Sequence, residues 1–95
     1  MLERDWQNTV VALAKALDWR VYHTHDSRRS DPGFPDLVLV RDRIIYAELK
    51  NEAGRLSKAQ ADWRNAIQAA GGTWFLWRPD DYEDVRQTLL RRRHA

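Results

Sequence analysis

Two acidic residues and one lysine in the middle of the chain are the residues best suited to chemistry. Asp36 stands before a short run of strand-forming apolar residues, and Glu48 and Lys50 stand two positions apart at the end of a second such run. Because side chains alternate along a strand, Glu48 and Lys50 are predicted to project from one face while Leu49 faces the core. The spacing therefore predicts a carboxylate and an ammonium group that are neighbours by geometry.

The segment between these residues is predicted to form a hairpin. Residues 36–40 and 44–49 are rich in strand formers, and Arg41-Asp42-Arg43 is short enough for a tight connection. If the connection is tight, the fold sets Asp36 opposite Glu48 or one residue away from it. The hairpin therefore predicts that two carboxylates and the ammonium group of Lys50 converge.

Two carboxylates at this separation predict a site for a hard divalent cation. They repel each other, and neither belongs in an apolar hairpin unless something compensates its charge. Mg²⁺ prefers oxygen ligands and is usually held by one or two carboxylates together with water and substrate phosphate, which fits Asp36 and Glu48, with the backbone carbonyl of Leu49 as a candidate extra ligand. Such an ion polarises a phosphoryl oxygen and lowers the pKa of a bound water, while Lys50 orients that water or stabilises developing charge. The predicted chemistry is phosphodiester hydrolysis.

The same three residues also have an ordinary structural interpretation. An Asp that begins a strand can simply cap a turn, and a Glu-x-Lys pair on an exposed strand is often a solvated ion pair. Here Asp36 follows Gly33-Phe34-Pro35, and the apolar strands around it are not typical of an exposed sheet face. This context favours the site without removing the alternative.

Periodicity predicts the elements before the hairpin. Apolar residues recur at intervals of three and four and predict a helix over residues 2–17. Alternation over residues 19–25 predicts a strand, and the density of turn formers and charge over residues 26–35 predicts an exposed loop. An acid-containing helix and a strand are therefore expected ahead of Asp36.

A second helix is predicted after Lys50, with Ser57 as its N-cap and Gln60 as the capping-box partner. Its buried stripe is predicted to consist of Ala59, Trp63, Ala66, Ile67 and Ala70. Gly71-Gly72 ends that helix, residues 73–77 predict another strand, and Pro79 opens a last helix with Tyr82, Val85 and Leu89 inward. The order is α-β-β-β-α-β-α, an α/β fold with a central mixed sheet flanked by helices.

Composition limits the classes of protein that fit. A chain of 95 residues with 43% hydrophobic content is the size of one domain, predicted to span residues 1–95. There is no Cys, which excludes a disulfide framework and a thiolate zinc site and favours an intracellular location. The N-terminal residues lack the pattern of a signal peptide, and no stretch approaches a membrane span, so no membrane partner is expected.

Cations and histidines supply candidate contacts to nucleic acid. The formal net charge is only +2, but basic residues gather in the middle of the chain, and Arg28, Arg29, Arg55 and Lys58 are the candidates for binding phosphate. His23 and His25 share a predicted strand face. They could bind a metal with a nearby Asp, line the entrance of the site or be ordinary core or loop residues, and the sequence does not decide between these roles.

The residues Gly33-Phe34-Pro35-Asp36-Leu37, Glu48-Leu49-Lys50 and Gln60 together resemble the signature of the VRR-NUC domain, a branch of the PD-(D/E)xK nuclease superfamily. The resemblance implies a restriction-endonuclease-like core in which Asp36 and Glu48 bind Mg²⁺ or Mn²⁺ and Lys50 is the catalytic lysine. It also implies that Glu3, a further possible metal ligand, and Gln60 complete or border the site. Gln60 keeps its structural alternative as a capping-box residue, and Glu3 lies at the edge of its helix stripe, where it reaches either the site or water.

The resemblance further implies a metal-dependent endonuclease acting on DNA. Stand-alone domains of this kind occur in phages and bacteria and are similar to Holliday-junction resolvases, which implies branched DNA as substrate, a role in replication, recombination or repair, a homodimer and a cytoplasmic location. The alternatives are a non-catalytic DNA-binding or complex-forming module that keeps the fold, and a structural protein whose acidic pair is a surface ion pair.

Overall fold

The computed structural model describes residues 1–25 and 30–93. Arg28 and Arg29, two of the predicted phosphate-binding residues, lie outside the described residues. The elements are helix α1 (Glu3–Ala16), strands β1 (Arg20–His23), β2 (Leu37–Val40) and β3 (Ile44–Leu49), helix α2 (Lys58–Ala69), strand β4 (Thr73–Trp77), a 3₁₀ turn (Pro79–Asp81) and helix α3 (Tyr82–Leu90). The predicted order and the mixed α/β class are confirmed, although β1 is shorter than predicted. No helix among the described residues has both the length and the apolar content needed to cross a membrane.

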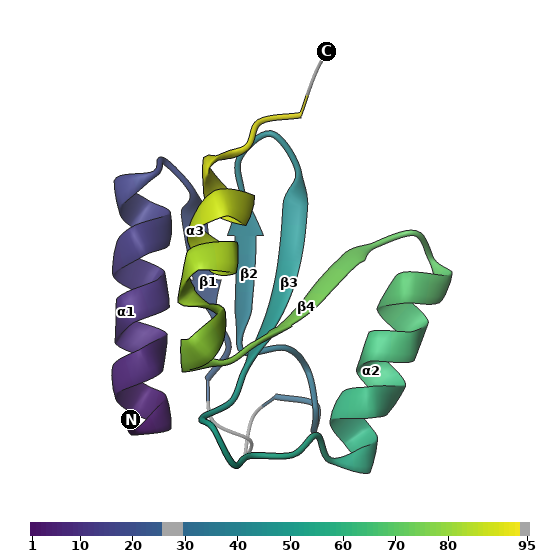
Figure 1. Ribbon diagram of the computed structural model, residues 1–95. Helices are drawn as coiled ribbons and strands as arrows, with labels where there is room; N and C mark the ends of the chain where they lie inside the picture. The colour runs from purple at the N-terminus through teal and green to yellow at the C-terminus, as the bar shows by residue number, and fades with distance from the viewer. Residues whose placement is uncertain (26–29, 94–95) are drawn as a thin grey trace.

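The four strands form one mixed sheet in the order β1-β2-β3-β4. The first three strands are antiparallel neighbours, and β4 returns parallel to β3 after the α2 crossover (Figure 1). The register of the β2–β3 hairpin pairs Leu37 with Ala47, and its continuation by one residue sets Asp36 opposite Glu48. The predicted hairpin and its register are therefore confirmed.

The core lies between one face of the sheet and the helices α1 and α3. Trp6, Val10 and Ala14 form the buried stripe of α1, and Val85 and Leu89 form that of α3. Alternate strand residues complete the core, among them Leu37, Leu39, Ile45, Ala47, Leu49 and Trp77. Because Asp36 and Glu48 alternate with these core residues, they point to the opposite face of the sheet.

Helix α2 is not buried as the sequence predicts. None of its residues, all of which the structure describes, is buried, and Ala66 and Ala70 of the predicted stripe are exposed. The helix makes its principal contact with β4 and stands away from β1 and β2 (Figure 1). The apolar spacing is correct for a helix, but residues 1–25 and 30–93 do not supply a surface that buries Ala66 and Ala70. The inward prediction for Tyr82 is also wrong, because this side chain is 40% exposed.

The connection between β2 and β3 has a structural role at the end of the hairpin remote from Asp36 and Glu48. Arg41 lies over the ring of Trp19 at 4.4 Å and donates hydrogen bonds to the carbonyls of Leu17 and Leu89 at 3.0 and 2.8 Å. Arg43 donates to the carbonyl of Thr88 at 2.8 Å. These two cations therefore hold the end of α3, away from Asp36 and Glu48.

Candidate functional site

Asp36 and Glu48 meet at one end of the sheet, on adjacent strands. The side chain of Asp36 accepts a hydrogen bond of 2.8 Å from the backbone N–H of Leu49, which holds its carboxylate against the end of β3. Glu48 is only 2% exposed and is the one buried charged residue among those described. A buried carboxyl group at this position needs compensation, because burial without a partner costs several kcal/mol.

The environment of Glu48 favours its protonated form. Burial raises the pKa of Glu48 to about 9, and the charge of Asp36 and a hydrogen bond between the two carboxyl groups act in the same direction. The ammonium group of Lys50 opposes this shift, and the charge of Glu3 adds to it. The pair therefore retains a proton at neutral pH, and a divalent cation placed between the carboxylates would replace that proton.

Lys50 follows directly on β3, and its backbone is fixed by the neighbouring strand. Its N–H donates to the carbonyl of Trp77 at 3.2 Å, and the same carbonyl accepts the indole N–H of Trp6 at 3.0 Å. A Cβ built on Gly54 would lie 3.0 Å from Cδ of Lys50, so the missing side chain at Gly54 leaves room for the lysine stem. The position of Lys50 is therefore determined by β4, α1 and the loop that follows it.

Gln60 performs two functions in the first turn of α2. Its backbone N–H donates to Ser57 Oγ at 3.1 Å, and its Oε1 accepts the Ser57 backbone N–H at 2.8 Å, which completes the predicted capping box. Its Nε2 then donates to Glu48 Oε2 at 3.0 Å. The sequence left open whether Gln60 caps the helix or borders the site, and the structure shows both contacts.

The turn at Gly33 packs the segment before Asp36 closely against the first turn of α2. Gly33 has φ +86°, and a Cβ added there would lie 2.4 Å from the backbone carbon of Ala59. Only glycine permits both that backbone conformation and that approach. Phe34 then packs edge-on against Trp63 at 5.0 Å and Tyr46 at 6.2 Å. The Gly-Phe-Pro segment therefore brings Asp36, Glu48 and Gln60 to one place.

A polar hollow of about 220 Å³ opens beside the acidic pair. Asp36 and Gln60 line it on one side, and Thr24, His25 and Asp31 line it on another. The Thr24 hydroxyl donates to the carbonyl of Pro35 at 2.7 Å, which fixes this wall of the hollow. The space is large enough for water or one substrate group next to Asp36.

Glu3 and the histidines surround the site at greater distance. Glu3 lies exposed in the first turn of α1, and its charge contributes to the raised pKa of Glu48. His23 contacts the side-chain nitrogen of Gln7 at 2.9 Å, and its ring lies 5.9 Å from that of His25. Within residues 1–25 and 30–93, no three His, Asp or Glu side chains form a group able to hold a metal ion. The described residues therefore contain neither a histidine metal site nor a three-carboxylate group of Glu3, Asp36 and Glu48.

The donor set suits a hard cation that keeps part of its water. Two carboxyl groups converge from Asp36 and Glu48, burial and the charge of Asp36 raise the pKa of Glu48, and a polar hollow lies beside the pair. Mg²⁺ and Mn²⁺ are commonly held by two carboxylates with water, backbone carbonyl and phosphate oxygens in the remaining positions. The residues therefore fit such an ion.

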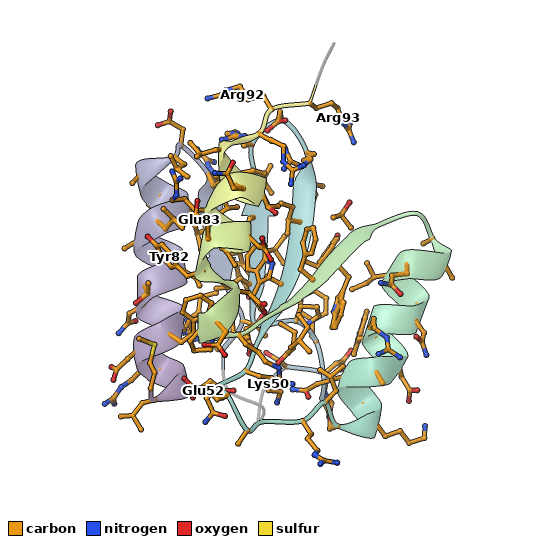
Figure 2. All side chains as sticks on the ribbon, in the orientation of Figure 1. Lys50, Glu52, Tyr82, Glu83, Arg92 and Arg93 are labelled. Atoms are coloured by element: carbon orange, nitrogen blue, oxygen red, sulfur yellow. The ribbon has the colours of Figure 1, made fainter. Side chains whose placement is uncertain are left out.

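The described basic side chains differ in whether an ion pair already occupies them or leaves them free to bind phosphate. Arg55 is exposed in the loop before α2, whereas Lys58 pairs with Asp62 at 2.9 Å. Lys50 lies at the end of the sheet reached by the start of α1 and the start of α2, and Arg92 and Arg93 lie at the opposite end (Figure 2). Of the two described residues predicted to bind phosphate, Arg55 is the one that carries no ion pair in the described structure.

Two supporting residues were not identified from the sequence. Asn51 Oδ1 accepts the backbone N–H groups of Ala53 and Gly54 at 3.1 and 2.8 Å and so shapes the turn after Lys50. Arg78 donates to the Asn51 carbonyl at 2.7 Å and ties this turn to the end of β4. An Asn two or three residues before a Gly was a signal for the turn, but nothing in the sequence pairs Arg78 with it.

A mixed sheet in this order, with an acidic pair and a lysine at one end, has the restriction-endonuclease-like fold. The family model of the VRR-NUC domain matches residues 3–78, and the chain belongs to this family of PD-(D/E)xK nuclease type. The match covers every element from α1 through β4, including Asp36, Glu48 and Lys50. No curated protein matches the chain at a significant level.

Proposed function

We propose that the protein is a divalent-metal-dependent endonuclease that hydrolyses phosphodiester bonds in DNA. The observation that carries the proposal is the contact between Asp36 and the buried Glu48, with the charge of Lys50 acting on the same carboxyl group. Membership of a nuclease-type family supports this activity. Asp36, Glu48 and the backbone carbonyl of Leu49 would hold Mg²⁺ or Mn²⁺, with water and substrate oxygens in the remaining positions.

The bound cation, Lys50 and Gln60 would have different roles in the hydrolysis. When bound, the cation supplies Lewis acidity for the phosphoryl oxygen and acidity for a bound water. Lys50 stabilises the negative charge that develops on the phosphoryl group as the water oxygen bonds to phosphorus and the bond to one sugar oxygen breaks. Gln60 holds Glu48 by the hydrogen bond of 3.0 Å, so that this carboxylate keeps one orientation.

The substrate proposed is branched or junction DNA. The nuclease domain itself occupies residues 3–78, and selection of DNA by this domain would rest on the shape of the DNA. Arg55, together with Arg28, Arg29 and Lys58, would contact phosphates. The activity would serve replication, recombination or repair in the cytoplasm of a bacterial cell, with a phage gene as one origin, and the acting form would be a homodimer.

Cleavage of matched DNA substrates tests the proposal. Labelled four-way junction, flap and duplex DNA of one sequence are incubated with Mg²⁺ or Mn²⁺ and the wild-type chain, Asp36→Asn or Lys50→Ala. We expect cutting of the branched substrates by the wild type and a loss of about a hundredfold or more in both variants. Asp80→Asn and Lys15→Ala make the same chemical changes at exposed positions and serve as controls. Equal cutting by all five proteins would disprove the assignment, and binding of DNA without cleavage would favour a non-catalytic module.

A further inference from the structure

Three consecutive arginines follow helix α3, at the end of the sheet remote from the acidic pair. Arg91, Arg92 and Arg93 are exposed, and none of them forms an ion pair with another described residue. Arg92 and Arg93 lie at one end of the molecule and Lys50 lies at the other (Figure 2). The family match ends at residue 78, so these arginines belong to a part of the chain that the family model does not cover. We call residues 91–93 the arginine segment.

The connection between β2 and β3 holds the backbone of the arginine segment. The carbonyl of Arg91 accepts hydrogen bonds from Arg41 at 2.6 Å and from Arg43 at 3.0 Å. The backbone N–H of Arg93 donates to a carboxylate oxygen of Asp42. Because two guanidinium groups share the Arg91 carbonyl, the loss of either one leaves that carbonyl held by the other. The segment is therefore fixed through its backbone, and its exposed side chains are not needed for this contact.

Asp42 does not neutralise the arginine segment. Its Oδ1 accepts a hydrogen bond of 2.8 Å from Arg41, and its Oδ2 accepts one of 3.0 Å from Arg43. Hydrogen bonds from the Arg93 backbone and from Arg41 hold the pKa of Asp42 well below its usual range, so this carboxylate stays ionised. Its charge is therefore balanced by Arg41 and Arg43, and the three guanidinium groups of the segment remain for another partner.

The ordinary interpretation of the arginine segment accounts for only part of it. Exposed arginines usually need no partner, and a cation at a helix C-terminus interacts favourably with the last carbonyl groups of the helix. Arg91 is the C-cap of α3, but this effect falls off within the last turn, so it does not explain Arg92 and Arg93. An ordered backbone that presents neighbouring guanidinium groups suits a polyanion, because each group can form two parallel hydrogen bonds with one phosphate.

A hollow of about 360 Å³ beside the arginine segment has room for a phosphate group. Arg43 and Arg93 line it on one side, and Gly71, Gly72 and Thr73 line it at the turn before β4. The two glycines have no side chains that would obstruct the space, and Thr73 is exposed. Arg and Thr side chains are common donors to DNA phosphates. The hollow therefore offers donors of the kind that bind a nucleic-acid backbone.

We infer that the arginine segment binds backbone phosphates of the DNA substrate as a second contact, separate from the acidic pair. The inference rests on the proposed function for the identity of the polyanion. Ile44 lines the same hollow as Arg93, and β3 rises about 13 Å from Ile44 to Glu48. Successive phosphates of one strand are about 3.4 Å apart along the duplex axis. The second contact therefore lies about four or more base pairs from the phosphodiester bond that is cut, and it selects substrates whose duplex extends that far.

DNA binding in the absence of metal tests the second contact. Fluorescence anisotropy of a labelled four-way junction is measured in EDTA at several salt concentrations. The proteins are the wild type, a double variant with Arg92→Gln and Arg93→Gln, and a matched double variant with Arg92→Lys and Arg93→Lys. We expect the Gln pair to weaken binding about tenfold or more and to make the dependence of log affinity on log salt concentration shallower by about two units, because two phosphate contacts are lost.

The Lys pair keeps both charges and should keep the salt dependence of the wild type. Urea unfolding verifies that both double variants are as stable as the wild type, since only exposed side chains change. An unchanged salt dependence in the Gln pair, or the same change in the Lys pair, overturns the inference.

Tethered cleavage measures where the arginine segment lies on the DNA. The chain has no Cys, so Arg92→Cys introduces a single thiol to which iron–EDTA is attached. We expect backbone scission about four or more base pairs from the position that the wild type cuts with Mg²⁺. Scission confined to the cut position, or spread evenly along the DNA as with the free reagent, overturns the inference.

Failure of the proposed function gives a different result. A wild type that cuts no DNA, but whose salt-dependent binding is weakened in the Gln pair, contradicts the nuclease activity alone. A wild type that cuts, with a Gln pair that binds DNA as the wild type does, contradicts the second contact alone.

Discussion

The side-chain amide of Gln60 connects Glu48 to the beginning of α2. Its Nε2 donates to Glu48 Oε2 at 3.0 Å, while its Oε1 accepts the backbone N–H of Ser57 at 2.8 Å. The amide cannot exchange its two ends without breaking the capping box, because the oxygen is already held by the backbone. The NH₂ group is therefore always directed at Glu48, and a helix cap orients a residue of the candidate site.

Replacing Gln60 and Ser57 one at a time should distinguish the role of Gln60 in the site from its role in the helix cap. We expect Gln60→Ala to lower the rate of metal-dependent cutting by about ten- to a hundredfold, since the loss of a residue that orients a metal ligand has effects of this size. Ser57→Ala removes only the capping hydroxyl and should cost about 1 kcal/mol of stability with little loss of cutting. Cleavage rates and urea unfolding of both variants are compared. Equal cutting rates in the two variants would mean that Gln60 serves the helix alone.

The raised pKa of Glu48 should make the metal-free protein less stable as the pH increases. Its pKa is about 9 in the folded chain against an ordinary value of 4.5, so the folded state binds one more proton between these pH values. Stability is then present at low pH and is lost as the pH rises through this window, by up to about 1.4 kcal/mol per pH unit. Urea unfolding at pH 5.5 and pH 8 measures this slope, and Glu48→Gln should flatten it.

Mn²⁺ should reverse this dependence, because the ion competes with the same proton. The melting temperature should rise more with Mn²⁺ at pH 8 than at pH 5.5 in the wild type, and little at either pH in Glu48→Gln. A pH-independent effect of Mn²⁺, equal in both proteins, would place the ion away from Glu48.

The hairpin and its acidic pair could be predicted from the sequence because they depend on local rules. Strand alternation sets Glu48 and Lys50 on one side, and a tight connection at 41–43 fixes the register that brings Asp36 opposite Glu48. The capping box at Ser57 and Gln60 is equally local, since both of its hydrogen bonds span three residues. Most of the candidate site could therefore be predicted from the spacing of residues that are close in the sequence.

The features that the sequence did not predict are contacts between segments that are far apart in the chain. The helical period of α2 shows which residues share a stripe, but it does not show whether the chain supplies a surface to cover Ala66 and Ala70. The sequence identifies Arg41 only as part of the tight connection, yet its side chain donates hydrogen bonds to the carbonyls of Leu17 and Leu89, which lie 24 and 48 residues away. Burial and ion pairing depend on how the chain packs, so the periodicity of apolar residues in the sequence does not predict them.

Gly33 should tolerate no side chain, and Gly71 provides the matched comparison. Both have φ +86°, so Ala strains the backbone equally at each position. At Gly33 the new Cβ would also lie 2.4 Å from backbone of Ala59, whereas nothing lies within 4 Å at Gly71. We expect Gly71→Ala to cost about 1 kcal/mol and Gly33→Ala about 3 kcal/mol or more, with a larger loss of cutting. Similar unfolding free energies would show that the Gly33 turn moves freely away from α2.

Arg41 and Arg55 should show opposite effects when each is replaced by Ala, although each change removes one positive charge. Arg41 is largely buried, stacks on Trp19 and holds the end of α3, so its loss should cost about 3 kcal/mol of stability while the DNA affinity of the folded protein stays the same. Arg55 is exposed in the loop between Lys50 and α2, so Arg55→Ala should leave stability within about 0.5 kcal/mol and weaken DNA binding. The dependence of log affinity on log salt concentration should become shallower by about one unit for Arg55→Ala only, because one phosphate contact is lost. Unfolding in urea and fluorescence anisotropy at several salt concentrations measure the two quantities, and an unchanged salt slope in Arg55→Ala would remove this arginine from the DNA-binding surface.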